Sequence, residues 1–205
     1  MGTVLGLARL AALGVALALT ACVTAENSLS QNDIAGMKLT GVTVSFAPNA
    51  FIQWEDGVRA YAASKGGTDN QILGVAQTPE AKAYVLTLLG SRVKAGIERA
   101  MAGQLSGPRP VRLDIVVKRF DLPPAVQSIL LGGGRGMNAD ANLVDARTGT
   151  LIIANPNLGA FMPSAGGLVG TVVQAAFDNA AEQSPADKLV NLYGENYRNW
   201  LLRQS

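Results

Sequence analysis

Four aspartates have the residue type and the spacing that catalysis or metal binding would need. They lie in or beside stretches whose alternating apolar residues are typical of strands: Asp114, Asp121, Asp140 and Asp145. Two carboxylates in environments that separate their pKa values can act as acid and base, and a group of carboxylates can hold a hard cation. Asp114 and Asp140 lie on the polar faces of their strands, so one pair can form if these strands are neighbours.

Solvated carboxylates on a strand face are far commoner than catalytic pairs, and this makes the enzyme the weaker hypothesis. Asp145 is also suited to the first position of an Asx-type turn, Asp145-Ala146-Arg147-Thr148-Gly149. We therefore predict a protein that is not an enzyme and has no catalytic residue, no cofactor and no metal site. A membrane-anchored enzyme that uses paired carboxylates remains as an alternative.

Composition excludes several kinds of site. The 205 residues include no histidine and a single cysteine, Cys22. Ser-His-Asp and Cys-His catalysis, histidine metal ligands and an internal disulfide are therefore excluded. The glycine run 132–136 follows an apolar segment and precedes a strand, which is the reverse of the order in a phosphate-binding loop, so we interpret it as a connector. Net charge is +2, from 17 basic and 15 acidic residues, and shows no electrostatic footprint for nucleic acid.

Cys22 stands at the end of an N-terminal apolar run. Arg9 is the only charge in residues 2–21, and the run from 10 to 19 is too short for a spanning helix. Leu19-Thr20-Ala21-Cys22 resembles the bacterial lipobox, in which a peptidase cuts before a cysteine that receives acyl chains. We predict Cys22 as the lipid attachment site and the membrane, through these chains, as a partner. Ordinary secretion after Val23-Thr24-Ala25, and an uncleaved anchor, remain as alternatives.

The signal also predicts the domain order and the compartment. Residues 1–21 form the signal peptide, 22–36 a flexible tether and 37–205 a single domain. In the alternative interpretation, part of the tether packs as a turn around Leu29 and Ile34. The residue after Cys22 is Val23 and not Asp, which implies, by resemblance to Gram-negative lipoproteins, sorting to the outer membrane with the domain facing the periplasm.

Hydrophobic periodicity predicts an α+β fold with a mixed sheet of about four strands. A strand over 38–46, ended by Pro48 and Asn49, precedes a helix that begins at Thr78-Pro79 and ends near Gly103. A strand over 111–120 completes β-α-β, with Val111, Leu113, Ile115 and Val117 on the face opposite Phe120. A hairpin pairs strands 137–143 and 150–154, and a last helix is capped by Ser184. Residues 47–77 are expected to be the least regular part, with a short helix over 58–63 and a loop over 65–70.

The middle of the chain resembles uncharacterised bacterial lipoprotein domains of unknown function. The segments that carry the resemblance are the strand Val111 to Phe120, Leu130-Leu131-Gly132-Gly133-Gly134, and Val144-Asp145-Ala146-Arg147-Thr148-Gly149. The order of elements is also similar to the small α+β domain of envelope proteins such as the N-terminal domain of TolB and the CsgG-like secretion lipoproteins. The resemblance implies a fold and a compartment and almost no chemistry.

Two nearly uncharged stretches, 125–131 and 166–177, and one aromatic stripe could form binding surfaces. Core packing is the simpler interpretation of both stretches, and an exposed face for a membrane, a subunit or an acyl ligand is the other. Tyr193, Tyr197 and Trp200 form the stripe, which we expect to anchor the last helix in the core. We predict a non-catalytic accessory or assembly component of a cell-envelope complex, with an envelope protein as partner. A periplasmic binder of a small apolar or acyl ligand is the alternative.

Overall fold

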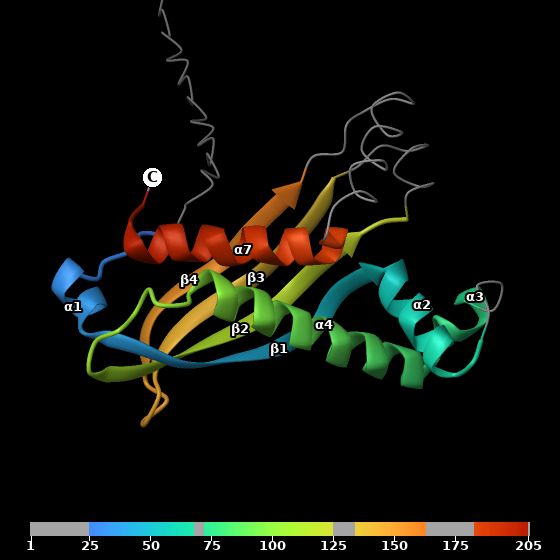
Figure 1. Cartoon of the computed structure of the whole chain (residues 1–205), viewed down its shortest axis with the longest axis horizontal. Coiled ribbons are helices and arrows are strands. Elements are labelled where there is room, and N and C mark those ends of the chain that lie inside the picture. The colour runs from blue at the N-terminus through green and yellow to red at the C-terminus, as the bar shows by residue number, and fades with distance from the viewer. Residues whose placement is uncertain (1–24, 68–71, 125–133, 163–182, 205) are drawn as a thin grey trace, which may run out of the picture.

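The structure, a computed structural model, describes residues 25–67, 72–124, 134–162 and 183–204. Its helices and strands follow one another along the chain (Figure 1): α1 Gln31–Ala35, β1 Met37–Trp54, α2 Glu55–Ser64, α3 Ile72–Val75, α4 Pro79–Ala100, β2 Arg109–Leu122, β3 Arg135–Asp145, β4 Leu151–Met162 and α7 Pro185–Leu202. No helix among the described residues is long and apolar enough to cross a membrane.

The sheet has four strands in the order β1-β2-β3-β4. β1 and β2 are parallel, whereas β2–β3 and β3–β4 are antiparallel. The chain is therefore α+β with a mixed sheet, as the periodicity predicts. α4 joins the parallel pair, and the turn 146–150 joins β3 to β4 through Gly149, whose φ of 73° is the left-handed conformation expected there.

Both edge strands run further than the sequence predicts. β1 continues through Pro48 to Trp54, with a shift of register between Phe46 and Phe51. β4 continues through Pro156 to Met162, and Asn157 adopts a φ of 56° at the shift. The predicted ends, at Pro48 for the first strand and at 154 for the last, are wrong because an edge strand has one side without a ladder, and an irregularity there absorbs a proline, which lacks an N–H.

A second irregularity changes the face of Phe120. Alternation from Val111 to Val117 places Phe120 on the polar face, yet the side chain is fully buried. The register between β2 and β3 shifts between Val117 and Arg119, and this exchanges the two faces of the strand beyond that point. Phe120 consequently packs in the core, edge to face with Trp54 at 6.1 Å between ring centroids.

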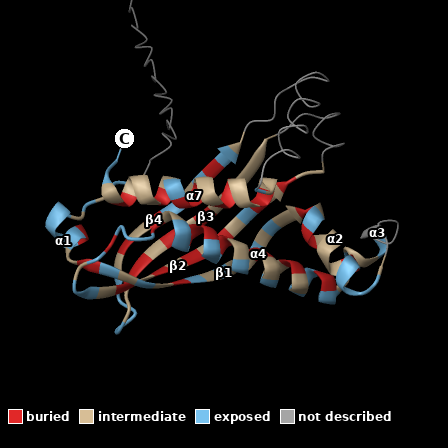
Figure 2. Ribbon diagram, viewed as in Figure 1, coloured by how far each residue is buried: buried red, intermediate tan, exposed pale blue. Residues whose placement is uncertain are grey.

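α4 and α7 lie across one face of the sheet (Figure 1), and the buried residues face the layer between helices and strands (Figure 2). Thr78 caps α4 and Ser184 caps α7, each followed by a proline at the start of the helix, as predicted. The two helices approach closely at Gly96, where a Cβ would lie 2.4 Å from Val190 Cγ1. A larger residue at position 96 would therefore force the helices apart.

The structure differs from the predicted tether at residues 25–36. Ser30 caps α1 in a reciprocal capping box with Asp33, and Ile34 is buried. Leu29 packs against the core. This agrees with the alternative interpretation, a packed turn around Leu29 and Ile34. Apolar burial and capping outweigh the polar composition that suggested flexibility. Residues 22–24 lie outside the described residues.

The long axis of the fold has two different ends. The α1 end carries α1, the turn 146–150 and the C-terminus of α7 (Figure 1). The α2 end carries α2, α3, the start of α7 and the C-terminal end of β4 (Figure 1). The described residues that border the two predicted apolar stretches, Pro124, Gly134, Met162 and Gln183, all belong to segments at the α2 end.

Candidate functional site

The structure makes Asp114 and Asp140 neighbours on adjacent strands but gives each its own partners. Asp114 lies opposite Asn142 in the β2–β3 ladder, and Asp140 lies opposite Val116. Asp114 accepts from Arg112 Nε at 2.6 Å and from Thr43 Oγ1 at 2.6 Å. Asp140 accepts from the backbone N–H of Asn157 at 2.8 Å and pairs with Lys118 Nζ at 2.6 Å. Both carboxylates therefore serve strand-to-strand contacts.

The other two aspartates, Asp121 and Asp145, form an ion pair and a turn, respectively. Asp121 pairs with Arg119 at 2.5 Å, and Asp145 accepts from the backbone N–H groups of Arg147 and Thr148 in the predicted Asx turn. These two N–H groups hold the pKa of Asp145 below its ordinary value. Within the described ranges, no three acidic or cysteine residues converge in a way that could hold a metal ion.

The hydrogen bond from Arg112 holds the pKa of Asp114 below its ordinary value, and Thr43 adds to this effect. A carboxyl whose pKa is lowered by folding stabilises the native state above its unfolded pKa, and the contribution is lost as the pH falls through the folded pKa. The ion pair is therefore a source of stability at neutral pH. It does not poise Asp114 as an acid.

Replacing both aspartates is expected to leave function intact. Asp114→Asn and Asp140→Asn each remove one half-exposed ion pair, and we expect each to lower the free energy of unfolding by less than about 1 kcal/mol. Complementation of a deletion strain, beside urea denaturation of the purified variants, checks this expectation. Loss of complementation by a variant of unchanged stability would contradict the non-catalytic interpretation.

The aromatic stripe of α7 has two roles. Tyr193 and Tyr197 are fully buried, and burial raises the pKa of both phenols. The Tyr193 hydroxyl donates to the Ala139 carbonyl at 3.3 Å, which fixes α7 on β3. Core anchoring is thus confirmed for these two residues. Trp200 is only half-buried, and its Nε1 donates to the Ala25 carbonyl at 2.5 Å.

The N-terminal segment binds the end of α7 through several groups, which the sequence interpretation missed. Asn27 Nδ2 donates to the carbonyls of Trp200 and Leu201, at 3.2 and 2.8 Å. Arg203 donates to the carbonyls of Asn27 and Leu29, both at 2.5 Å. The bonds from Asn27 cap carbonyls at the end of the helix, and those from Arg203 hold the N-terminal segment in return. The one local signal in the sequence is Ser30 with Asp33 three residues later, a helix-start pattern.

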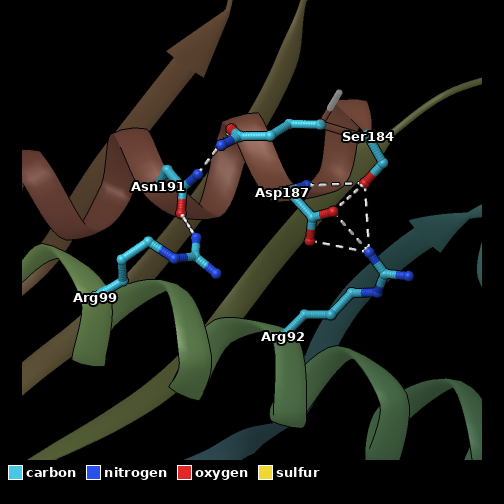
Figure 3. A network of polar contacts seen from close by, with 6 residues as sticks. Arg92, Arg99, Ser184, Asp187 and Asn191 are labelled. Carbon is cyan, nitrogen blue, oxygen red and sulfur yellow. Dashed lines mark hydrogen bonds and ion pairs between the residues drawn. The ribbon is translucent and has the colours of Figure 1, made fainter. Parts of the chain in front are cut away.

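Two arginines of α4 hold the start of α7 (Figure 3). Arg92 Nη1 donates to both carboxylate oxygens of Asp187, at 2.9 and 3.0 Å, and Arg99 Nη1 donates to Asn191 Oδ1 at 2.7 Å. Ser184 completes the network by donating to Asp187 at 2.7 Å. The Arg92 guanidinium also lies over the ring of Trp54, 5.3 Å from its centroid. The network therefore connects the start of α7 to Trp54 at the end of β1.

A pocket of about 780 Å³ opens at the α2 end. A volume of this size suits a small molecule or an inserted side-chain cluster. Its wall combines the end of β1, the first turns of α2, the link before α4, the first turns of α4 and the second residue after β2. The lining residues are Ala50, Ile52, Gln53, Trp54, Glu55, Val58, Arg59, Ala76, Gln77, Lys82, Val85, Leu86 and Pro124.

Trp54 is the largest element of the wall. It is buried, and Gly57 of α2 lies against its ring so closely that a Cβ there would be 2.5 Å from Cε3. Glu55 is the only acidic residue among the described lining residues, and it pairs with Arg59 at 2.7 Å. Lys82 adds a second basic group. The described part of the wall is thus mainly apolar, carries basic groups and holds no pair of carboxylates.

Several sequence-based predictions fall on residues outside the described ranges. These are the lipid attachment site Cys22, the apolar stretches 125–131 and 166–177, and the first two residues of the glycine run, 132 and 133. The described part of that run begins at Gly134, where a Cβ would clash with the ring of Phe161 at 1.9 Å. Close approach of an aromatic ring therefore explains the glycine at 134, and no anion site is needed.

No family model and no curated protein matches this sequence. Partial structural similarity exists to a lipoprotein candidate of Caulobacter crescentus CB15, with 15% identity over 56% of this chain and 81% of the other, and a TM-score of 0.34. A Xanthomonas campestris protein from a family of unknown function shares 16% identity over 58% of this chain and 62% of its own, with a TM-score of 0.35.

A lipoprotein of Neisseria meningitidis is similar over 73% of this chain and 99% of its own, at 15% identity and a TM-score of 0.26. Similarity at this level assigns neither a family nor an activity. The resemblance to the TolB N-terminal domain and to CsgG-like lipoproteins stays a prediction.

Proposed function

We propose that this protein is an outer-membrane lipoprotein, anchored by acyl chains on Cys22, whose periplasmic domain is a non-catalytic binding component of a cell-envelope complex. The observation that supports binding is the position of the pocket. It lies at the α2 end, whereas the segment that continues toward Cys22 is bound at the α1 end. A lipid-anchored protein with this arrangement holds its pocket away from its point of attachment.

The contact of Ala25 with Trp200 favours cleavage before Cys22 over cleavage after Ala25. Cleavage after Ala25 would remove the carbonyl that accepts from Trp200 Nε1 and would leave a charged amino group on Glu26 beside it. Trp200 is half-buried, so the loss of this hydrogen bond is expected to cost about 0.5–1.5 kcal/mol. The lipobox interpretation keeps this acceptor in the mature chain.

The carboxylate contacts favour binding over catalysis. Each aspartate that the sequence singles out has a basic partner or a turn of its own, and the pocket wall holds one acid, already paired with Arg59. Binding of a partner needs only the apolar wall with its polar margin. An inserted apolar side chain of a protein partner would gain about 25 cal/mol for each Å² of apolar surface that it buries there.

A periplasmic binder of an apolar or acyl ligand is the second candidate. The observation that favours it is the combination of Ile52, Val58 and Leu86 with the basic residues Lys82 and Arg59 in one wall. An acyl chain would occupy the apolar part, and its acidic head would approach the basic groups. The same pocket therefore serves either occupant, and experiment separates them.

Filling the pocket tests both candidates. Ala50→Trp places a large side chain in the pocket, and Ala47→Trp, a half-buried position of the same strand outside the wall, is the matched control. A photo-crosslinking residue at Ala76 is expected to form a defined protein adduct that Ala50→Trp abolishes and Ala47→Trp retains. If no protein adduct forms and Ala50→Trp instead removes an amphiphile that is extracted from the purified unsubstituted protein, the ligand-binding candidate is correct. No change in either readout would contradict a function for this pocket.

A further inference from the structure

The bound N-terminal segment fixes how the domain meets the membrane. The carbonyl of Ala25 accepts from Trp200, Asn27 donates to two carbonyls at the end of α7, and Arg203 donates to two carbonyls of the segment. Leu29 and Ile34 pack against the core on either side of the Ser30 cap. The chain is therefore part of the folded domain from Ala25 onward.

Very little chain remains between this point and the acyl attachment. Only Val23 and Thr24 separate Cys22 from Ala25. Three residue steps of fully extended chain span at most about 11 Å. A lipidated Cys22 lies at the headgroup level of the bilayer. Ala25, and with it the end of α7, is therefore held within about 11 Å of that level.

We infer that the acylated protein sits directly on the membrane through its α1 end, with Trp200 and Arg203 at the level of the phospholipid headgroups and the pocket directed away from the bilayer. This inference rests on the proposed function, because it requires acylation of Cys22. The partner of the α1 end is a phospholipid surface, and a half-buried tryptophan beside an exposed arginine suits that environment.

The length of α7 sets the distance between membrane and pocket. Its 18 residues span about 27 Å from the α1 end to the α2 end. The pocket therefore opens toward the periplasm when α7 stands up from the membrane. The acyl chains supply the attachment, so the seating needs no anionic lipid. Zwitterionic lipid is thus sufficient for the test.

The experiment compares two fluorescent labels on the full acylated protein in phosphatidylcholine vesicles that carry a nitroxide on the headgroup. Gln204→Cys places one label at the α1 end, and Ser64→Cys places the other on the exposed end of α2. Cys22 does not react because its sulfur carries the lipid. We expect the label at 204 to be quenched several-fold more strongly than the label at 64.

A flexible linker inserted between Thr24 and Ala25 should abolish this difference. About 15 Gly/Ser residues have an r.m.s. span of about 21 Å, which lets the domain leave the surface. The same linker added after Ser205 is the control and should leave quenching at 204 unchanged. Weak quenching at both labels on vesicle-bound protein, or equally strong quenching at both, would overturn the inference while the anchor stands. Failure of the unmodified protein to bind vesicles would overturn the anchor itself, and the inference with it.

Discussion

Cys22→Ala is expected to abolish acyl labelling and to move the protein from the membrane fraction to the soluble periplasmic fraction. Cys22 is the only cysteine of the chain, so no other thiol can take its place. Val23-Thr24-Ala25 still offers the variant an ordinary cleavage site, which removes the apolar run 10–19. None of the helices in the described ranges is long and apolar enough to cross a membrane. Labelling with a radioactive fatty acid, followed by fractionation, measures both effects.

The control for this variant is Ser28→Ala, which changes an exposed residue close to the cysteine and leaves the lipobox intact. Ser28→Ala should remain acylated and should sediment with the membranes. Should Cys22→Ala sediment with them after a carbonate wash, another part of the chain must hold the protein, and the uncleaved run 10–19 would be the first candidate.

Phe120→Ala is expected to lower the free energy of unfolding by about 3–5 kcal/mol, the usual cost of removing a large buried aromatic side chain. Phe120 is fully buried and packs against Trp54, so its loss leaves a cavity behind the wall of the pocket. Urea denaturation of the purified protein gives the midpoint and the slope from which this free energy is obtained.

Phe51→Ala is the matched control, because Phe51 is 47% exposed and makes one contact with a charged side chain, Arg119, at 4.7 Å. Its loss should cost less than about 1 kcal/mol. Two phenylalanines on paired strands thus have very different expected effects. If the two substitutions cost the same, Phe120 lies on the open face and the irregularity near Lys118 is wrong.

Phe120 marks the limit of what the alternating pattern of β2 predicts. Val111, Leu113, Ile115 and Val117 alternate without interruption, and the structure buries all four as predicted. A register shift in the β2–β3 ladder then exchanges the buried and exposed faces of the strand. The side-chain types around Lys118 do not predict this shift. The position of a strand is therefore predictable from its period, whereas the face of a residue beyond an irregularity is not.

Prolines and polar composition misled the sequence interpretation for a related reason. A proline would break a central strand, but Pro48 and Pro156 both lie in edge strands. Whether a strand lies at the edge is a property of the whole sheet. The segment 25–36 is polar, yet Leu29 and Ile34 are enough to pack it once the end of α7 is present to receive it. Each outcome depends on a distant element that local spacing does not encode.

The pocket was beyond prediction in the same sense. Its wall draws on positions between Ala50 and Pro124 that come from several separate elements. Trp54 is the only aromatic residue among the described residues of the wall, and the sequence alone placed it in an irregular region. The carboxylates were easier, because Asp145 occupies a turn position with a known hydrogen-bond pattern and the structure confirms it.

Intact mass analysis of the protein extracted from isolated outer membranes tests the central claim most directly. The account predicts a mature chain that begins at Cys22 and carries the added mass of acyl chains, with the peptide that contains Ala25 and Asn27 still attached. A chain that begins at Glu26 without acyl groups, or one that retains residues 1–21, would contradict it.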